Sequence, residues 1–199
     1  MAVPPPPPNA LPGDPAKPAL RADLKARRSM HVRSLGEAGA RLANAAAAAL
    51  VLPHIPPGMV VGLYLALQDE LDPAPLVELL HARGQAITMP HLLDLRTMRF
   101  RAWAPGDAVE RGPMKLRQPL PSAEERAPDL IVTPLLGFDR AGNRIGHGAG
   151  HYDRAFAQFP GARRLGLAWS VQEESHVPHD PWDVPLHAIV TEKEFIACA

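Results

Sequence analysis

The sequence predicts a single α/β domain built around a mostly parallel β-sheet. Apolar runs of strand length alternate along the chain with segments of helical periodicity, which is the pattern of a layered α/β fold. The chain has 199 residues, of which 46% are hydrophobic, and this is enough for one core. No change in composition divides residues 16–199, so we expect one domain there.

The composition argues against several classes of protein. Lys and Arg together number 21, as do Asp and Glu, so no excess charge favours nucleic acid or a membrane surface as a partner. No apolar run approaches the roughly 18 to 20 residues of a membrane-spanning helix. Cys198 is the only cysteine in the sequence, which excludes a disulfide framework and a cysteine-based zinc site. A reducing compartment fits this cysteine usage, and we expect a cytoplasmic protein.

Residues 1–15 are expected to form a proline-rich tail outside the domain. They read MAVPPPPPNALPGDP, and five consecutive prolines fit neither a helix interior nor a sheet. The segment lacks the basic region followed by an apolar region that is typical of a signal peptide.

Two helices are expected before the first strand. Over residues 17–33, Leu20 and Leu24 fall on one face, while basic residues recur every three or four positions on another. The second helix covers residues 36–50 and ends in an alanine-rich run. A breaker of Pro and Gly, PHIPPG, follows it.

Strands and helices then alternate along the rest of the chain. Residues 59–67 and 129–136 are apolar runs of strand length, and residues 73–84 predict a helix with Pro near its start and Gly84 at its end. Residues 105–128 contain Pro and Gly and are expected to form a loop. The further elements expected are strands over 86–90 and 98–104, a helix over 151–159, and strands over 164–170 and 187–192.

A glycine-rich turn lies between the strand at 129–136 and the following helix. Gly146, Gly148 and Gly150 occupy alternate positions of the stretch RIGHGAGHYDR. In α/β folds ligands bind where strands lead into helices, and a helix N-terminus favours phosphate. The spacing is neither that of the Rossmann fingerprint nor that of the P-loop. The residues alone leave two interpretations open, a phosphate-binding loop and a merely tight turn.

Asp153, in the first turn of the predicted helix, also has two interpretations. It can offset the helix dipole, or it can serve as an oxygen ligand of Mg²⁺ bound to the same phosphates. His147 and His151 are four residues apart, but their spacing falls within the turn rather than on one helix. This pattern therefore does not favour zinc.

The segment DLIVTPLLGFDRAGNRIGHGAGHYDRAF resembles the signature of the 5-formyltetrahydrofolate cyclo-ligases, P-G-x-x-F-D-x-x-G-x-R-x-G-x-G-x-G-x-Y-D. The positions that match are Pro134, Phe138, Asp139, Gly142, Arg144, Gly146, Gly148, Gly150, Tyr152 and Asp153. The K-x-x-L-R start at Lys17 and the segments QDELD, GQAITMP and VPHDPWDVPLHAIVTE extend the resemblance over most of residues 17–192. Leu135, His151 and Met114 depart from the Gly, aromatic residue and Trp found in family members.

The resemblance implies an ATP-dependent ring closure. The formyl oxygen of 5-formyltetrahydrofolate attacks the γ-phosphoryl group, N10 then attacks the activated carbon, and phosphate leaves to give 5,10-methenyltetrahydrofolate. The implied fold is a three-layer α/β sandwich with a mostly parallel sheet, of the NagB/RpiA/CoA-transferase-like kind. Implied partners are ATP, Mg²⁺ and 5-formyltetrahydrofolate with or without a polyglutamate tail. No nucleic acid or membrane partner is expected. The protein is expected to be a monomer.

The resemblance also implies roles for individual residues. Lys17 and Arg21 match ATP contacts, although without the resemblance they would be taken for a solvated helix face. Leu65 and Glu70 match folate contacts, and core packing explains Leu65 equally well. The nucleotide loop comprises Arg144, Ile145, Gly146, His147, Gly148, Ala149, Gly150, His151 and Tyr152. Within it Gly148 and Tyr152 also face folate, Arg144 and Tyr152 are the catalytic candidates, and Asp153 and Asp183 match magnesium ligands.

Two alternatives to this enzyme remain open. One is a non-catalytic folate- or nucleotide-binding paralogue of the same fold, in which the changes at His147 and His151 have ended turnover. The other is a related enzyme that phosphorylates a different N-formyl or pterin substrate. Lys17, Glu70 and Asp153 argue against the loss of activity.

Overall fold

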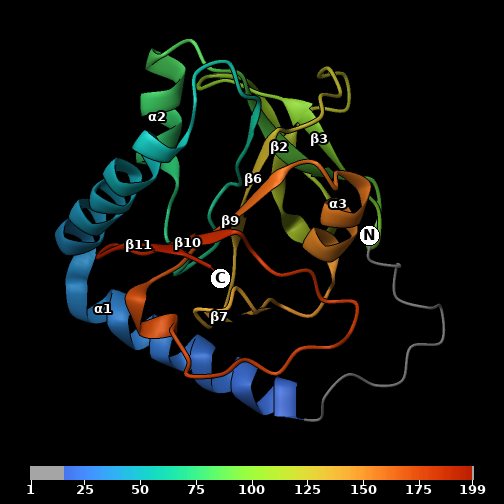
Figure 1. The fold of residues 1–199 in the computed structure, drawn as a ribbon. Helices are drawn as coiled ribbons and strands as arrows, with labels where there is room; N and C mark the ends of the chain where they lie inside the picture. The colour runs from blue at the N-terminus through green and yellow to red at the C-terminus, as the bar shows by residue number, and fades with distance from the viewer. Residues whose placement is uncertain (1–15, 199) are drawn as a thin grey trace.

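A central seven-stranded sheet organises the computed structural model, which describes residues 16–198; the expected tail at 1–15 lies outside this range. The sheet order is β11-β10-β9-β6-β1-β2-β3 (Figure 1). The α-helices are α1 (Ala16–Val51), α2 (Ala74–Ala82) and α3 (His151–Gln158). The strands are β1 (Val61–Gly62), β2 (Ile87–Leu92), β3 (Met98–Ala102), β4 (Val109–Arg111), β5 (Arg117–Pro119), β6 (Leu130–Pro134), β7 (Gly137–Phe138), β8 (Arg144–Ile145), β9 (Arg163–Leu167), β10 (Ala188–Val190) and β11 (Phe195–Ala197).

The five central strands of the sheet are parallel, and an antiparallel strand closes each edge. Strands β10, β9, β6, β1 and β2 pair in parallel, while β11 and β3 pair antiparallel with their neighbours. Val61 of β1 is in register with Ile87 of β2 on one side and Leu130 of β6 on the other. The predicted α/β class with a mostly parallel sheet is confirmed.

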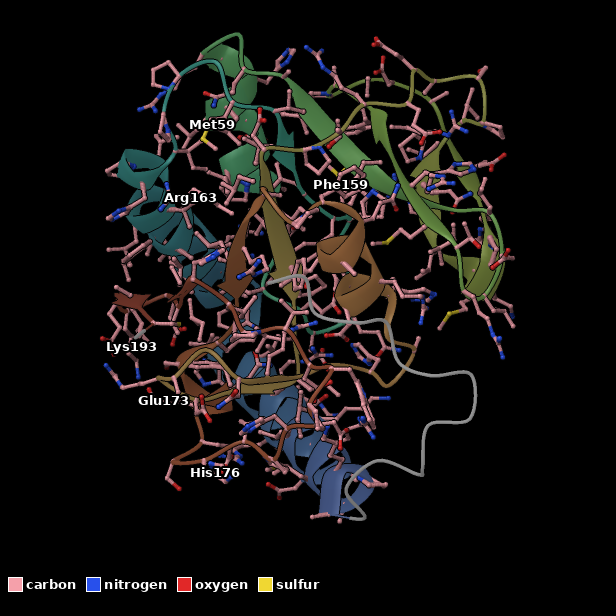
Figure 2. All side chains as sticks on the ribbon, turned by 45° about the vertical axis from the view of Figure 1, so that its right-hand side comes forward. Met59, Phe159, Arg163, Glu173, His176 and Lys193 are labelled. Atoms are coloured by element: carbon pink, nitrogen blue, oxygen red, sulfur yellow. The ribbon has the colours of Figure 1, made fainter. Side chains whose placement is uncertain are left out.

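Helices cover both faces of the sheet, so the molecule has three layers (Figure 1). Strand β6 shows how the sequence builds them, because its successive side chains alternate between the faces. Leu130 and Val132 join the cluster under α1 and α2, whereas Ile131 joins the cluster under α3. Met59 packs against the first cluster and Phe159 against the second, and Figure 2 shows them on the α2 and α3 sides of the central strands.

Helix α1 is broken at Gly36, close to the boundary that the sequence predicts between two helices. Gly36 has φ 64° and ψ 176°, a conformation that glycine adopts without steric cost. The C-terminal half packs Ala47, Ala48 and Val51 into the first cluster, whereas Leu24 of the N-terminal half packs beside Ile145. Despite its 36 residues α1 is not apolar enough to cross a membrane, and neither is any other helix within residues 16–198.

The structure corrects several predicted boundaries. The run 59–67 supplies only the two paired residues of β1, because the chain leaves the sheet after Leu63. The predicted loop 105–128 contains the hairpin of β4 and β5, joined through a short 3-10 helix at Pro113–Lys115. The predicted strands at 164–170 and 187–192 are the shorter β9 and β10. The sequence reading also missed β7, β8 and the edge strand β11.

Candidate active site

A cavity of about 700 Å³ lies where the parallel strands end, and it gathers every residue to which the resemblance assigns a role in binding or catalysis. Thr133 and Pro134 bring the end of β6 to it, and Leu65 brings the segment that follows β1. The predicted residues on its wall are Lys17, Arg21, Leu65, Glu70, Arg144, Ile145, Gly146, His147, Gly148, Ala149, Gly150, His151, Tyr152, Asp153 and Asp183.

Glycine occupies the three positions of the turn for different structural reasons. Gly148 and Gly150 have φ of 94° and 66°, in the left-handed region that favours glycine, and Gly150 is the N-cap of α3. Gly146 has no such φ. A Cβ built on Gly146 would meet no atom within 4 Å, so neither backbone geometry nor packing requires glycine there. The cavity therefore reaches bare backbone at Gly146, which leaves room for a ligand to approach closely.

Part of the signature holds the turn together rather than facing the cavity. The buried carboxylate of Asp139 accepts hydrogen bonds from the backbone N–H groups of Ala141, Asn143 and Val177. Gly142 has φ 87°, and a Cβ there would lie 2.5 Å from the carbonyl oxygen of Leu186. These two residues fix the bend that leads from β7 into β8.

Arg144 is held in place on the cavity wall by three neighbours. Its Nη2 donates to Asp153 Oδ1 at 2.5 Å, and its Nη1 donates to the carbonyl oxygen of Val184 at 2.5 Å. The guanidinium carbon lies 4.7 Å from the centre of the Phe156 ring, within cation–π range. Arg144 is thereby a preorganised cation, and Asp153 is its counter-charge.

Lys17 forms the second cation–carboxylate group of the site. Its Nζ lies 2.5 Å from Asp180 Oδ2 and 2.7 Å from Asp183 Oδ2. The backbone N–H of Asp180 also donates to Asp183 Oδ2 at 2.9 Å, so the two acids form one compact turn. Burial alone lowers the pKa of Lys17, but hydrogen bonds and charge from both carboxylates outweigh it and raise that pKa. The ammonium group is therefore firmly charged.

Arg21, one helical turn beyond Lys17, contacts the glycine turn directly. Its Nε donates to the carbonyl oxygen of Gly146 at 3.0 Å, and its guanidinium lies 3.5 Å from where a Cβ on Gly148 would be. The basic face of the first helix thus meets the glycine turn, although the sequence alone would describe it as solvated.

Glu70 presents a buried carboxylate to the same cavity. It closes a turn in which its backbone N–H donates to the carbonyl oxygen of Leu67, and Leu67 N–H donates to Glu70 Oε2 at 2.9 Å. Gln68 within the turn has φ 48°, an uncommon conformation for a residue other than glycine. Trp169 Nε1 donates to the carbonyl oxygen of Asp69 at 2.8 Å and ties the turn to the core.

The glycine turn and the Glu70 turn touch through one side chain. His147 Nε2 lies 3.3 Å from Glu70 Oε1. Beside them, burial and the charge of Glu70 both raise the pKa of Tyr152, so its hydroxyl stays protonated and can donate a hydrogen bond. Burial also raises the pKa of Tyr64, whose hydroxyl donates to the carbonyl oxygen of Leu71.

Apolar side chains also line the cavity. They come from β2, β3 and the β4–β5 turn, and they suit a flat ring system. They are Met89, Leu92, Met98, Met114 and Leu116. Met114 and its neighbour Lys115 have φ of 58° and 61°, so the turn that presents Met114 carries backbone strain.

The sequence reading missed several residues on the cavity wall. Asp180 stands three positions before Asp183 in a segment that the resemblance already covers, so acid spacing could have indicated it. Tyr64, Gln118 and Trp182 carried no signal, because an aromatic residue in an apolar run and a polar residue in an expected loop are ordinary features.

Two carboxylates of the cavity wall, Asp153 and Asp183, are suited to Mg²⁺. Residues 16–198 contain no group of three or more His, Cys, Asp or Glu side chains able to hold a metal ion by themselves. Mg²⁺ usually takes only one or two carboxylates from the protein, together with water and the phosphates of its substrate. Asp153 and Asp183 line the same cavity and meet that requirement. The residues fit a metal that arrives with a nucleotide.

Comparisons with known proteins identify the family of this chain. A sequence profile of the 5-formyltetrahydrofolate cyclo-ligase family matches residues 14–192. The chain is 30% identical over 156 residues to the 5-formyltetrahydrofolate cyclo-ligase of Escherichia coli (strain K12), which covers 74% of this chain and 86% of that protein. It is 30% identical over 151 residues to the enzyme of that name from Mycolicibacterium smegmatis (strain ATCC 700084 / mc(2)155), covering 73% and 75% respectively.

Solved structures of the same kind share the fold. The NMR structure of Aquifex aeolicus 5,10-methenyltetrahydrofolate synthetase has a TM-score of 0.76 and 26% identity, covering 91% of this chain and 92% of that one. A 5,10-methenyltetrahydrofolate synthetase from Mycoplasma pneumoniae has a TM-score of 0.65 and 22% identity, covering 89% and 99% respectively, and supports the fold. The profile spans nearly the whole described domain, and the chain belongs to the 5-formyltetrahydrofolate cyclo-ligase family.

Proposed function

We propose that this chain catalyses the ATP-dependent cyclisation of 5-formyltetrahydrofolate to 5,10-methenyltetrahydrofolate, with release of ADP and phosphate. The observation that carries the proposal is the composition of the cavity. Its wall combines a glycine turn and the cations Lys17, Arg21 and Arg144 with the buried acid Glu70 and apolar side chains. The turn and the cations suit a triphosphate, and the acid with the apolar side chains suits a pterin.

The cations and the glycine turn are proposed to position the triphosphate. Phosphoryl transfer needs alignment and charge stabilisation more than covalent help from the protein. Lys17, Arg21 and Arg144 supply positive charge, and Gly146 admits the phosphates close to the backbone. Bound Mg²⁺ would neutralise charge on the phosphates, and Asp153 and Asp183 are the residues proposed to hold it.

Glu70 and the apolar walls are proposed to hold the folate. A carboxylate accepts hydrogen bonds from pterin N–H groups, and Glu70 is already fixed by its bond from Leu67. Leu65 and the apolar side chains of β2 and β3 would pack against the ring faces. This arrangement would present the formyl oxygen toward the γ-phosphate at the glycine turn.

The reaction then proceeds in two balanced steps. The formyl oxygen attacks the γ-phosphorus as the bond to the ADP oxygen breaks, which leaves a formyl carbon activated as its phosphate ester. N10 attacks that carbon and loses its proton, the carbon–oxygen bond breaks, and inorganic phosphate departs. Arg144 is proposed to stabilise the transferred phosphoryl group, and the protonated Tyr152 hydroxyl to donate to a substrate oxygen.

We extend the proposal to a polyglutamate tail on the folate, to the absence of other partners, to the location and to the oligomeric state. Arg154 lines the cavity, and Arg117 lines it as an exposed residue near Met114, so basic groups are available to a polyglutamate tail. Balanced charge favours neither nucleic acid nor a membrane as a partner, and a lone cysteine suits a reducing cytoplasm. We further propose that the protein acts as a monomer.

Absorbance of the methenyl product tests the proposal. Mixing the protein with 5-formyltetrahydrofolate, ATP and Mg²⁺ should produce the methenyl band, and omission of either ATP or Mg²⁺ should abolish it. Saturable folate binding without the band would favour the non-catalytic paralogue. Release of ADP without the band would favour the enzyme that phosphorylates a different substrate.

A further inference from the structure

We propose that His147 couples the two substrate sites: it holds Glu70 in the ligand-free protein, and binding of the folate releases it together with the glycine turn. This inference rests on the proposed function, because it concerns how the two substrates of that reaction affect each other. It assigns to His147 a positioning role that the motif does not contain.

One oxygen of Glu70, Oε1, links His147 to the proposed folate site. Its side chain is 3% exposed and that of His147 is 45% exposed, so His147 reaches from the open side of the cavity to a buried carboxylate. Glu70 Oε2 already accepts from Leu67 N–H at 2.9 Å. Oε1 is the oxygen left for a ligand, and this is the oxygen that lies 3.3 Å from His147 Nε2.

His147 has no second side-chain hydrogen bond among residues 16–198, so Glu70 alone anchors its ring. The other histidine of the turn is anchored elsewhere, since His151 Nε2 contacts the carbonyl oxygen of Leu95 at 2.9 Å. Gly146 and Gly148 flank His147, and glycine imposes little conformational restraint on its neighbours. Arg21 and Arg154 hold the backbone on either side of His147, at the carbonyl oxygens of Gly146 and Ala149. The His147 side chain is therefore what ties the middle of the turn to Glu70.

The consequence is a linkage between the sites. A pterin N–H that donates to Oε1 must displace His147, and the displaced residue frees the turn to close on the triphosphate. Folate then tightens nucleotide binding because the nucleotide no longer has to break the His147–Glu70 contact. By thermodynamic reciprocity, the nucleotide tightens folate binding by the same factor.

The coupling can be measured directly by calorimetry. A non-hydrolysable ATP analogue with Mg²⁺ is titrated into the protein with and without saturating 5-formyltetrahydrofolate, and the ratio of the two dissociation constants is taken. The parent should show a ratio of about five or more, at the lower end of typical couplings. His147→Ala should bring the ratio close to one. His151→Ala, on the same turn but without contact to Glu70, should keep the parent ratio.

A second variant and a spectroscopic measurement approach the contact from the other side. Glu70→Gln, studied at folate concentrations raised to saturation, should also lose the coupling. The imidazole resonances of His147 should shift when 5-formyltetrahydrofolate is added without nucleotide, while those of His151 should move much less.

The possible results distinguish a failure of the coupling from a failure of the proposed function. A parent ratio of one, or a His147→Ala ratio equal to the parent's, overturns the coupling while both ligands still bind. Unchanged His147 resonances on addition of folate also overturn it. A parent protein that binds neither ligand contradicts the proposed function itself.

Discussion

Asp153 and Asp183 are each paired with a cation. Arg144 holds Asp153, and Lys17 holds Asp183 together with Asp180. A triphosphate offers these cations a new set of oxygens, and Mg²⁺ offers the carboxylates a new cation. Binding of MgATP can therefore exchange one set of ion pairs for another without leaving a buried charge unmatched.

Asp153→Asn tests the metal role against a role limited to pairing with Arg144 and offsetting the dipole of α3. Asn keeps the size and an oxygen that can accept from Arg144, and loss of the dipole interaction costs at most about 1 kcal/mol. We expect the free energy of unfolding to fall by no more than about 1–2 kcal/mol. Turnover should need far more Mg²⁺ and be much slower, as measured by product absorbance over a magnesium titration. Parental turnover at the same Mg²⁺ concentration would leave Asp153 only as a partner of Arg144 and of the helix dipole.

Lys17→Ala should weaken the binding of ATP and spare that of folate. A charge-assisted contact is worth about 1.5–3 kcal/mol, which corresponds to at least a tenfold rise in the ATP dissociation constant. Lys25→Ala is the matched control, because Lys25 lies on the same helix but is exposed and outside the cavity. Calorimetry with each ligand decides the matter. Weaker folate binding with unchanged ATP binding would contradict the assignment.

Among single residues, the sequence could indicate those inside a dense motif but not those whose partners are remote. Gly146–Asp153 lie in one motif. Asp180 was missed although it stands three positions before Asp183, because its contact with Lys17, 163 positions away in the sequence, gave no sequence signal. Met114 was noticed only as a departure, and its left-handed backbone could not be foreseen.

At the scale of elements, the β8–α3 turn combines glycines with two different functions. Gly148 needs its φ of 94°, whereas Gly146 faces open space. Gly148→Ala should cost about 1 kcal/mol or more of stability through backbone strain. Gly146→Ala should stay within about 0.5 kcal/mol of the parent, yet weaken the ATP analogue at least tenfold by filling the space beside the backbone. Chemical denaturation and calorimetry measure the two effects. Equal stability losses would contradict this division.

The junction of β9 and β10 should make the protein sensitive to acid. Arg164 N–H donates to His187 Nδ1 at 3.0 Å, and burial together with Arg164 and Arg163 lowers the pKa of His187 below 6.5. The unfolded chain therefore takes up this proton first. The stabilisation that neutral His187 gives the folded protein is complete above about pH 6.5. It is lost as the pH falls toward the lowered pKa of His187.

His187→Asn checks this dependence, because its amide oxygen can accept from Arg164 N–H but does not titrate. The stability advantage of the parent over the variant should shrink between pH 7.5 and pH 5 in chemical denaturation. An advantage that grows on acidification would contradict the sign.

Element prediction succeeded where the apolar periodicity and the Pro or Gly breakers indicated the same boundaries. It failed where buried apolar residues lie outside the paired part of a strand. The helices at α2 and α3 and the strands β2, β3 and β6 follow the expected patterns. The strand predicted over 59–67 was too long, because Leu63 and Tyr64 are buried beyond the end of the paired segment. The hairpin of β4 and β5 was missed because its short, partly exposed strands carry no apolar pattern.

At the scale of the whole molecule, the cavity joins the first helix to residues near the C-terminus. Ligands that occupy it should therefore stabilise the entire domain. At a hundred times their dissociation constants, a single bound ligand adds about 2.7 kcal/mol to the free energy of unfolding. The ATP analogue with Mg²⁺ should raise the melting temperature of the parent, and the rise should be smaller in Lys17→Ala. An equal rise in both proteins would contradict the contact between Lys17 and the nucleotide.

The pairing of Lys17 with Asp180 and Asp183 also has a consequence for how the protein is made. Residues 17 and 183 are 166 positions apart, so Lys17 leaves the ribosome long before the acids that hold it. During synthesis at about 5–20 residues per second, the N-terminal half of α1 must wait many seconds for its partners. A nascent chain cannot form this pairing until residue 183 has emerged, so the cavity wall is completed late in synthesis. In the proposed function, ATP turnover therefore begins only after residue 183 has reached its place.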